Sequence, residues 1–65
     1  MPKYPNITVQ LVGQDSNAFN ILGICRRAMK RARLPESEIE AFTAEATSGN
    51  YDHLLATCCE WFNVE

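Results

Sequence analysis

Residues 7–33, ITVQLVGQDSNAFNILGICRRAMKRAR, change their hydrophobic period from two to about 3.6 across a short polar turn. In the first part, apolar residues occupy every second position, which is typical of a half-buried strand over Ile7–Val12. After the turn, apolar residues recur along one side of a helix predicted over Ala18–Arg33. The sequence therefore predicts an N-terminal strand followed directly by an amphipathic helix.

The polar turn, Gly13-Gln14-Asp15-Ser16-Asn17, separates these two elements. Asp15, Ser16 and Asn17 each carry a short side-chain acceptor suited to capping the helix, and the sequence leaves open which of them does so. Phosphate-binding loops also join a strand to a helix, but the turn lacks their glycine pattern and Asp15 would repel a phosphate. We therefore interpret this segment as a capping turn.

Two further helices follow. Pro35 ends the first helix and can be the first residue of the second, while Ser37–Glu40 matches a capping box that would start it two residues later. Ser48 and Gly49 predict its end, with Gly49 in a left-handed conformation, and Asn50 predicts the cap of a third helix.

The predicted fold is α+β, with one N-terminal β-strand followed by three α-helices around a single small core, in a single domain over residues 1–65. A lone strand needs a hydrogen-bonding partner. Either a stretch such as Phe62–Glu65 pairs with it, or the strand of a second copy does. Because so short a chain buries little surface, we expect a homodimer through Ile7–Val12.

The cysteines number three, Cys25, Cys58 and Cys59, and match neither a disulfide framework nor a zinc-binding spacing. We expect Cys25 and Cys58 to be small core residues and Cys59 to be partly exposed. The N-terminal residues lack a signal-peptide pattern and no apolar run approaches a membrane span. The expectation is a cytoplasmic protein with reduced thiols, without metal or cofactor and without membrane association.

Cysteine and histidine together suggest a thiol nucleophile, but no residue in the sequence is placed to orient His53 as a base. We therefore expect no catalytic residue and no enzyme.

The strongest candidate binding surface is a basic cluster on the first helix. It precedes seven of the eight acidic residues, in a chain of net charge −2. Such a face suits nucleic-acid phosphates or an acidic protein surface, or is merely solvated. The negative net charge disfavours a dedicated nucleic-acid binder. Its members are Arg26, Arg27, Lys30, Arg31 and Arg33.

Two segments carry a family resemblance, YPNITVQLVGQDSNAFNILG at residues 4–23 and SGNYDHLL at residues 48–55. With Trp61, they resemble a family of small uncharacterised bacterial and phage-borne proteins. The resemblance implies no activity. It implies only that Arg33 stands where similar chains have a helix-ending Gly, and that the family pattern includes Gly13, Asp15, Asn17, Asp52 and His53.

A weaker resemblance links the strand and helices to ribbon-helix-helix DNA-binding proteins, although no Arg or Lys lies in the strand. The function we expect is a small non-enzymatic protein-interaction or regulatory module, associated with phage or mobile elements and acting through a protein partner. The alternative is a ribbon-helix-helix-like DNA-binding regulator.

Overall fold

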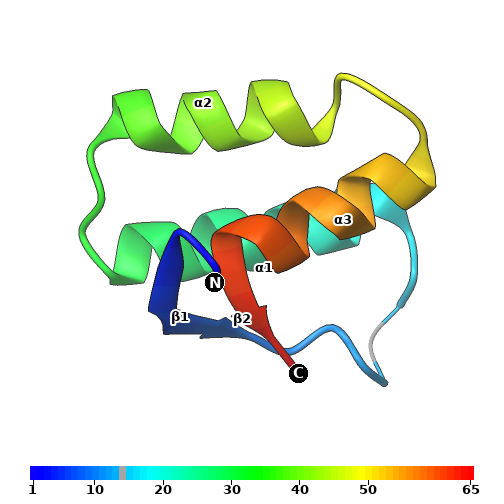
Figure 1. The fold of residues 1–65 in the computed structure, drawn as a ribbon, viewed down its shortest axis with the longest axis horizontal. Coiled ribbons are helices and arrows are strands. Elements are labelled where there is room, and N and C mark those ends of the chain that lie inside the picture. Colours follow the sequence, from blue (N-terminus) through cyan, green and yellow to red (C-terminus); the bar gives the residue numbers. More distant parts are fainter. Residues whose placement is uncertain (14) are drawn as a thin grey trace.

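A computed structural model describes residues 1–13 and 15–65. It confirms the α+β fold and adds a short C-terminal strand (Figure 1). The elements in chain order are β1 (Tyr4–Val9), α1 (Ala18–Arg31), α2 (Glu36–Ala46), α3 (Tyr51–Trp61) and β2 (Phe62–Val64). No helix among the described residues is long and apolar enough to cross a bilayer.

The two strands form a parallel two-stranded sheet, so the first strand finds its partner within the chain. Thr8 pairs with Asn63 and Val9 with Val64, and the register shifts between Tyr4 and Thr8. Of the two partners that the sequence left open, the C-terminal stretch is the one observed. The bounds predicted for the strand were wrong, because β1 begins three residues earlier, at Tyr4, and ends at Val9. Leu11 and Val12 lie beyond it and donate their backbone N–H groups to the carbonyl of Glu65.

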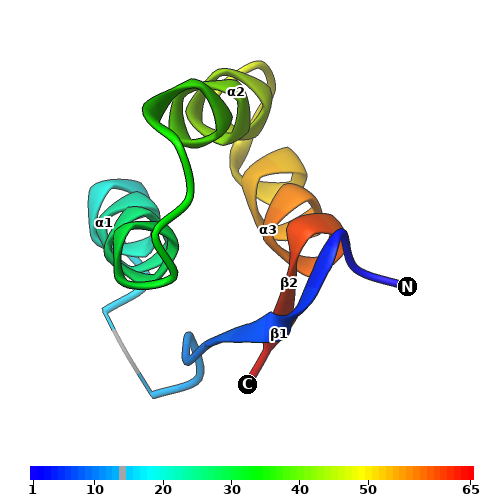
Figure 2. The ribbon, with the colours of Figure 1, turned by 90° about the vertical axis from the view of Figure 1, so that its left-hand side faces the viewer.

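The three helices form an arc over the two strands (Figure 2). Their inward-facing side chains and those of the sheet meet in one hydrophobic cluster, within which the Phe42 and Phe62 ring centroids lie 5.1 Å apart. Buried apolar residues come from every element, so the small core depends on all five elements at once. The cluster contains Ile7, Val9, Ile21, Cys25, Met29, Ile39, Phe42, Ala46, Leu54, Cys58 and Phe62.

Helix α1 begins after Asn17, whose side chain accepts the Phe19 N–H at 2.8 Å. The helix ends at Arg31, two residues before the predicted end. The reason is a Schellman turn, in which Leu34 N–H bonds to the Met29 carbonyl at 3.1 Å and Arg33 N–H to the Lys30 carbonyl at 2.9 Å. Arg33 takes the left-handed position of this turn, with φ of 62°.

Helix α2 begins at Glu36, with Pro35 as its N-cap, so both predicted starts were wrong. Ser37 lies inside the first turn and caps nothing, because the preceding Pro35 already sets the extended entry to the helix. Gly49 has no positive φ, contrary to the prediction. A Cβ at Gly49 would come 2.8 Å from Cβ of His53, so glycine is required here for close approach.

Candidate functional site

The five basic residues of the predicted binding surface do not form one site. Arg26 is half-buried, and its Nε is buried without a hydrogen-bond partner among the described residues. Lys30 and Arg33 are exposed and do not line the space between α1 and β1, whereas Arg27 and Arg31 do. Helix rotation separates them, since consecutive residues point about 100° apart.

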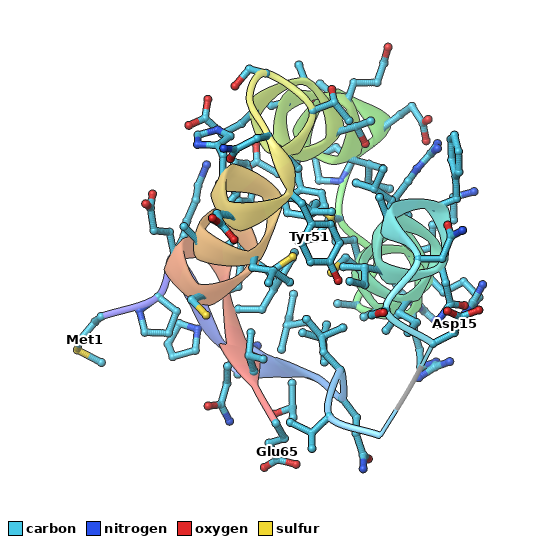
Figure 3. All side chains as sticks on the ribbon, turned by 90° about the vertical axis from the view of Figure 1, so that its right-hand side faces the viewer. Met1, Asp15, Tyr51 and Glu65 are labelled. Carbon is cyan, nitrogen blue, oxygen red and sulfur yellow. The ribbon has the colours of Figure 1, made fainter. Side chains whose placement is uncertain are left out.

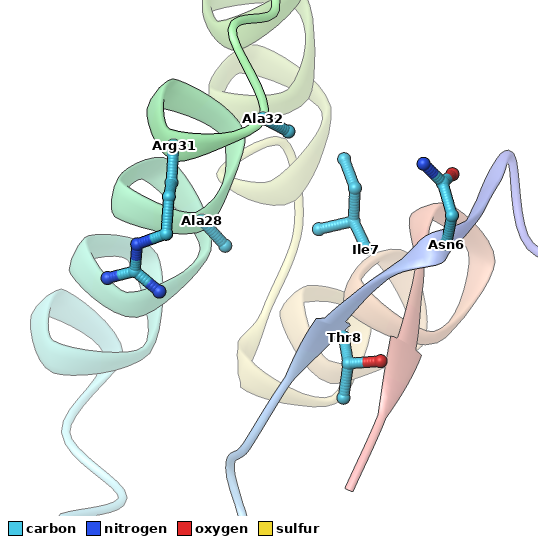
Figure 4. A pocket seen from close by; sticks show the side chains of 6 residues that line it. All are labelled: Asn6, Ile7, Thr8, Ala28, Arg31 and Ala32. Carbon is cyan, nitrogen blue, oxygen red and sulfur yellow. The ribbon is translucent and has the colours of Figure 1, made fainter.

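A groove lies between α1 and β1 (Figure 4). It consists of two adjoining hollows of ≈ 210 and ≈ 300 Å³ that share Thr8, Ala28 and Arg31 as lining residues. Val9, Gln10, Ile24 and Arg27 complete the second hollow. Arg27 also lies over Gly23, where a Cβ would come 3.3 Å from its Nη1. The groove is therefore lined on the α1 side by small and apolar side chains together with Arg27 and Arg31.

Arg27 and Arg31 make no ion pair within the described part of the chain. In that part of the chain Lys3 forms an ion pair with Glu38 at 2.5 Å, and His53 Nε2 lies 4.0 Å from Glu45 Oε1. The acidic residues of the chain thus leave the positive charge of the groove unneutralised at short range. That charge is available to a negatively charged ligand.

The residues of the family pattern lie in turns and at helix ends, where Asp15, Asn17 and His53 make local hydrogen bonds. Asp15 Oδ1 accepts the Asn17 N–H at 3.1 Å, and Gly13 has φ of 85°, which favours glycine. Gln14, predicted within the same turn, lies outside the described residues. The backbone N–H of His53 donates to the side chain of Asn50, the N-cap of α3. The ring Nε2 of His53 lies 2.9 Å from the Glu45 carbonyl oxygen near the end of α2.

Asp52 is exposed in the first turn of α3, where a negative charge suits the helix dipole. The family-pattern residues therefore have structural roles. They are not among the residues that line the space beside Arg27 and Arg31.

Cys25 and Cys58 lie side by side in the core, with their Sγ atoms 3.6 Å apart, and Cys59 is exposed. The hydrogen bond to Cys58, together with burial, raises the pKa of the Cys25 thiol. A thiol that stays protonated is a poor nucleophile and a poor metal ligand. No group of three or more metal-binding side chains gathers within residues 1–13 and 15–65.

Sequence reasoning missed an apolar hollow of ≈ 340 Å³ near the ends of the strands. Tyr51 projects from α3 toward the N-terminal end of α1, and its hydroxyl donates to the Ser16 carbonyl at 2.6 Å (Figure 3). Val12 and Cys59 also line the hollow. These residues come from segments far apart in the chain, so no local pattern reveals them.

The sequence analysis also missed a polar cluster at the N-terminus. Tyr4 donates its hydroxyl to Glu38 Oε1 at 2.6 Å, and Lys3 Nζ contacts the same oxygen while lying 4.1 Å from the centroid of the Trp61 ring. The hydrogen bond from Lys3, followed by that from Tyr4, holds the pKa of Glu38 below its usual range. The cluster fastens the N-terminal residues to α2 and α3.

No family model, curated protein or solved structure matches this chain. The resemblance to small bacterial and phage-borne proteins therefore stays a prediction.

Proposed function

We propose that this chain is a small, non-enzymatic protein-interaction module that binds an acidic surface of a partner protein through the groove between α1 and β1. The observation that carries the proposal is the pair Arg27 and Arg31. Both line the groove, both are exposed, and neither forms an ion pair within the described residues. Guanidinium groups bind carboxylates with two parallel hydrogen bonds.

A cytoplasmic location and an association with phage or mobile elements belong to the same proposal. They rest on the cysteine usage and on the family resemblance described above. A homodimer through the first strand has less support than the sequence suggested, because β1 already has a partner along one edge.

The second candidate, a ribbon-helix-helix-like DNA-binding regulator, is favoured by the basic side of α1. That class uses an intermolecular ribbon of strands to read the major groove. Here β1 pairs in parallel with β2 of the same chain, and the net charge is −2. Both features support a protein partner over a polyanion.

Binding of a fluorescent deca-glutamate peptide and of a random-sequence DNA duplex tests the two candidates. We expect the peptide to bind and the double variant R27E/R31E to bind it at least about tenfold more weakly, a change of about 1.4 kcal/mol. The matched control, K30E/R33E, makes the same change of net charge outside the groove and is expected to stay within about threefold of wild type.

Equal losses in the two double variants would contradict the groove as the site. Sub-micromolar, sequence-selective DNA binding that is lost in R27E/R31E would replace the proposal with the DNA-binding alternative. Non-specific DNA contacts lie at about 10⁻⁴ to 10⁻⁶ M, so this outcome is distinguishable from background.

A further inference from the structure

The edge of β1 that faces away from β2 has unused backbone hydrogen-bonding groups. The Val9 carbonyl accepts the Glu65 N–H at 2.8 Å, and the Leu11 N–H donates to the Glu65 carbonyl at 2.6 Å. Alternate residues of an extended chain direct their backbone groups to opposite edges. Thr8 lies opposite Asn63 in the register, and by this alternation Thr8 and Gln10 direct their backbone groups away from β2. No backbone partner of Gln10 is seen within residues 1–13 and 15–65.

This free edge opens into the basic groove. Asn6–Thr8 line it opposite Ala28–Ala32, and Thr8–Gln10 line it opposite Ile24–Arg31, so β1 and α1 run antiparallel along the groove. Four residue steps of a strand span about 13 Å, and eight steps of a helix span about 12 Å. The two walls therefore match in length, and that length corresponds to an extended segment of four or five residues.

The spacing of the two arginines fits a strand as well. Arg27 and Arg31 are four residues apart on α1, which separates them by about 6 Å along the helix axis. Residues i and i+2 of a strand lie about 6.6 Å apart and point to the same side. Two carboxylates at alternate positions of a strand in the groove would each meet one arginine, with the small side chain of Ala28 between them.

We propose that the partner enters this groove as an added β-strand. The occupant is an extended segment of an acidic partner protein, with Asp or Glu at positions i and i+2 facing Arg27 and Arg31, and with backbone hydrogen bonds to Thr8 and Gln10. Strand addition of this kind combines main-chain affinity with side-chain specificity at alternate positions. The inference rests on the proposed function and states how the acidic partner is held.

A second copy of this chain fits the groove less well. Residues 6–10 of the second copy, NITVQ, contain no acid, and the second copy would bring another Arg27 and Arg31 beside the first pair. Like charges placed opposite each other are unfavourable in paired strands. Charge complementarity therefore selects an acidic segment from another protein.

The test uses the peptide acetyl-Thr-Glu-Thr-Glu-Thr-Glu-Thr-amide, titrated into the full chain while the amide NMR signals of Thr8 and Gln10 are followed. A clustered peptide of the same composition, acetyl-Thr-Glu-Glu-Thr-Thr-Glu-Thr-amide, has no two Glu residues at positions i and i+2 and tests the spacing. Two further versions carry N-methyl groups, one at the amides of the Glu residues and the other at the amides of the inner Thr residues. Alternate amides of a strand face opposite edges, so in an added strand either the Glu amides or the inner Thr amides donate hydrogen bonds to β1. The other amides face the open edge, where an N-methyl group removes no hydrogen bond to the protein.

We expect the alternating peptide to shift the Thr8 and Gln10 signals and the clustered peptide to bind at least fivefold more weakly. One N-methylated version should lose at least tenfold in affinity, and the other should stay within about threefold of the parent. R27E/R31E should lose the binding while K30E/R33E retains it, with both variants checked for a native amide spectrum.

Equal binding of all four peptides, still dependent on Arg27 and Arg31, would overturn strand addition and leave the acidic-partner function intact. Absence of binding, or binding that R27E/R31E does not weaken, would overturn both. Concentration-dependent shifts of Thr8 and Gln10 without peptide would assign the edge to a second copy and overturn the proposed occupant.

Discussion

The backbone N–H of Glu65 donates to the carbonyl of Val9 at 2.8 Å, so the last residue of the chain is bonded to the end of the first strand. The two residues are far apart in sequence, and the three helices lie between them. This contact extends the parallel pairing of β1 and β2 and fastens both ends of the chain to one sheet. The same C-terminal segment contains Phe62, which lies buried in the small core. We therefore expect stability to depend strongly on Phe62.

We expect Phe62→Ala to unfold most of the protein at 25 °C. Phe62 is fully buried against Phe42, and removing such a side chain costs about 3–5 kcal/mol. A core of this size supplies only about 3–5 kcal/mol in total. Urea unfolding followed by circular dichroism measures the loss. The neighbouring control Asn63→Ala, which removes an exposed hydrogen bond from Asn63 Nδ2 to Thr8 Oγ1, should cost no more than about 1 kcal/mol. A cooperative native-like transition of Phe62→Ala would contradict the expectation.

Arg33→Gly should stabilise the protein by about 1 kcal/mol. Arg33 has φ of 62°, a left-handed conformation that costs a residue with a Cβ about 1–2 kcal/mol and glycine almost nothing. The midpoint of urea unfolding should rise accordingly. Arg33→Ala is the matched control, since it removes the same charge but keeps the Cβ. An equal gain in both variants would attribute the effect to charge and not to the backbone.

Stability should depend on pH through the cluster of Lys3, Tyr4 and Glu38. Because the pKa of Glu38 is lowered in the folded state, its contribution is present above the unfolded value of about 4.3 and is lost as pH falls through the folded pKa. The hydrogen bond to Glu38 raises the pKa of Tyr4, so its contribution is present below about 10 and is lost as pH rises through the folded pKa.

Urea midpoints at acidic, neutral and alkaline pH measure both effects. Glu38→Gln should flatten the profile at both ends, and Tyr4→Phe should flatten the alkaline end and weaken the acidic one, since Tyr4 also supports the Glu38 carboxylate. Glu40→Gln, at an exposed position on the same helix, should retain the wild-type profile. A wild-type profile in Glu38→Gln would show that the cluster does not couple to folding.

Of the three thiols, Cys59 should be the one that reacts with a maleimide in the native protein. Cys25 and Cys58 have no exposed surface, and the raised pKa of Cys25 keeps it protonated. Mass spectrometry should find one label in native buffer, three in denaturant and none in native Cys59→Ser. Rapid native labelling at Cys58 would contradict the packing of the two buried thiols.

Local sequence was sufficient wherever local interactions decide the outcome. The three helices, the cap at Asn50, the turn before α1 and the burial of Cys25 and Cys58 follow from side-chain period and from capping groups within a few residues. The end of α1 was predicted less well, because Arg33 occupies a left-handed position that sequence preference assigns to glycine.

Tertiary structure decided what depends on residues distant in the chain. β2 is three residues long and has no period of its own, so Phe62–Val64 becomes a strand because α3 delivers it beside β1. The same pairing extends from Tyr4, so that β1 begins earlier than the sequence pattern predicts. The packing of α1 against β1 places two of the five basic residues, Arg27 and Arg31, along the groove. Local sequence was enough to predict the three helices and the basic composition of α1. The strand pairing, the free edge and the groove came from long-range contacts, which a local pattern does not encode.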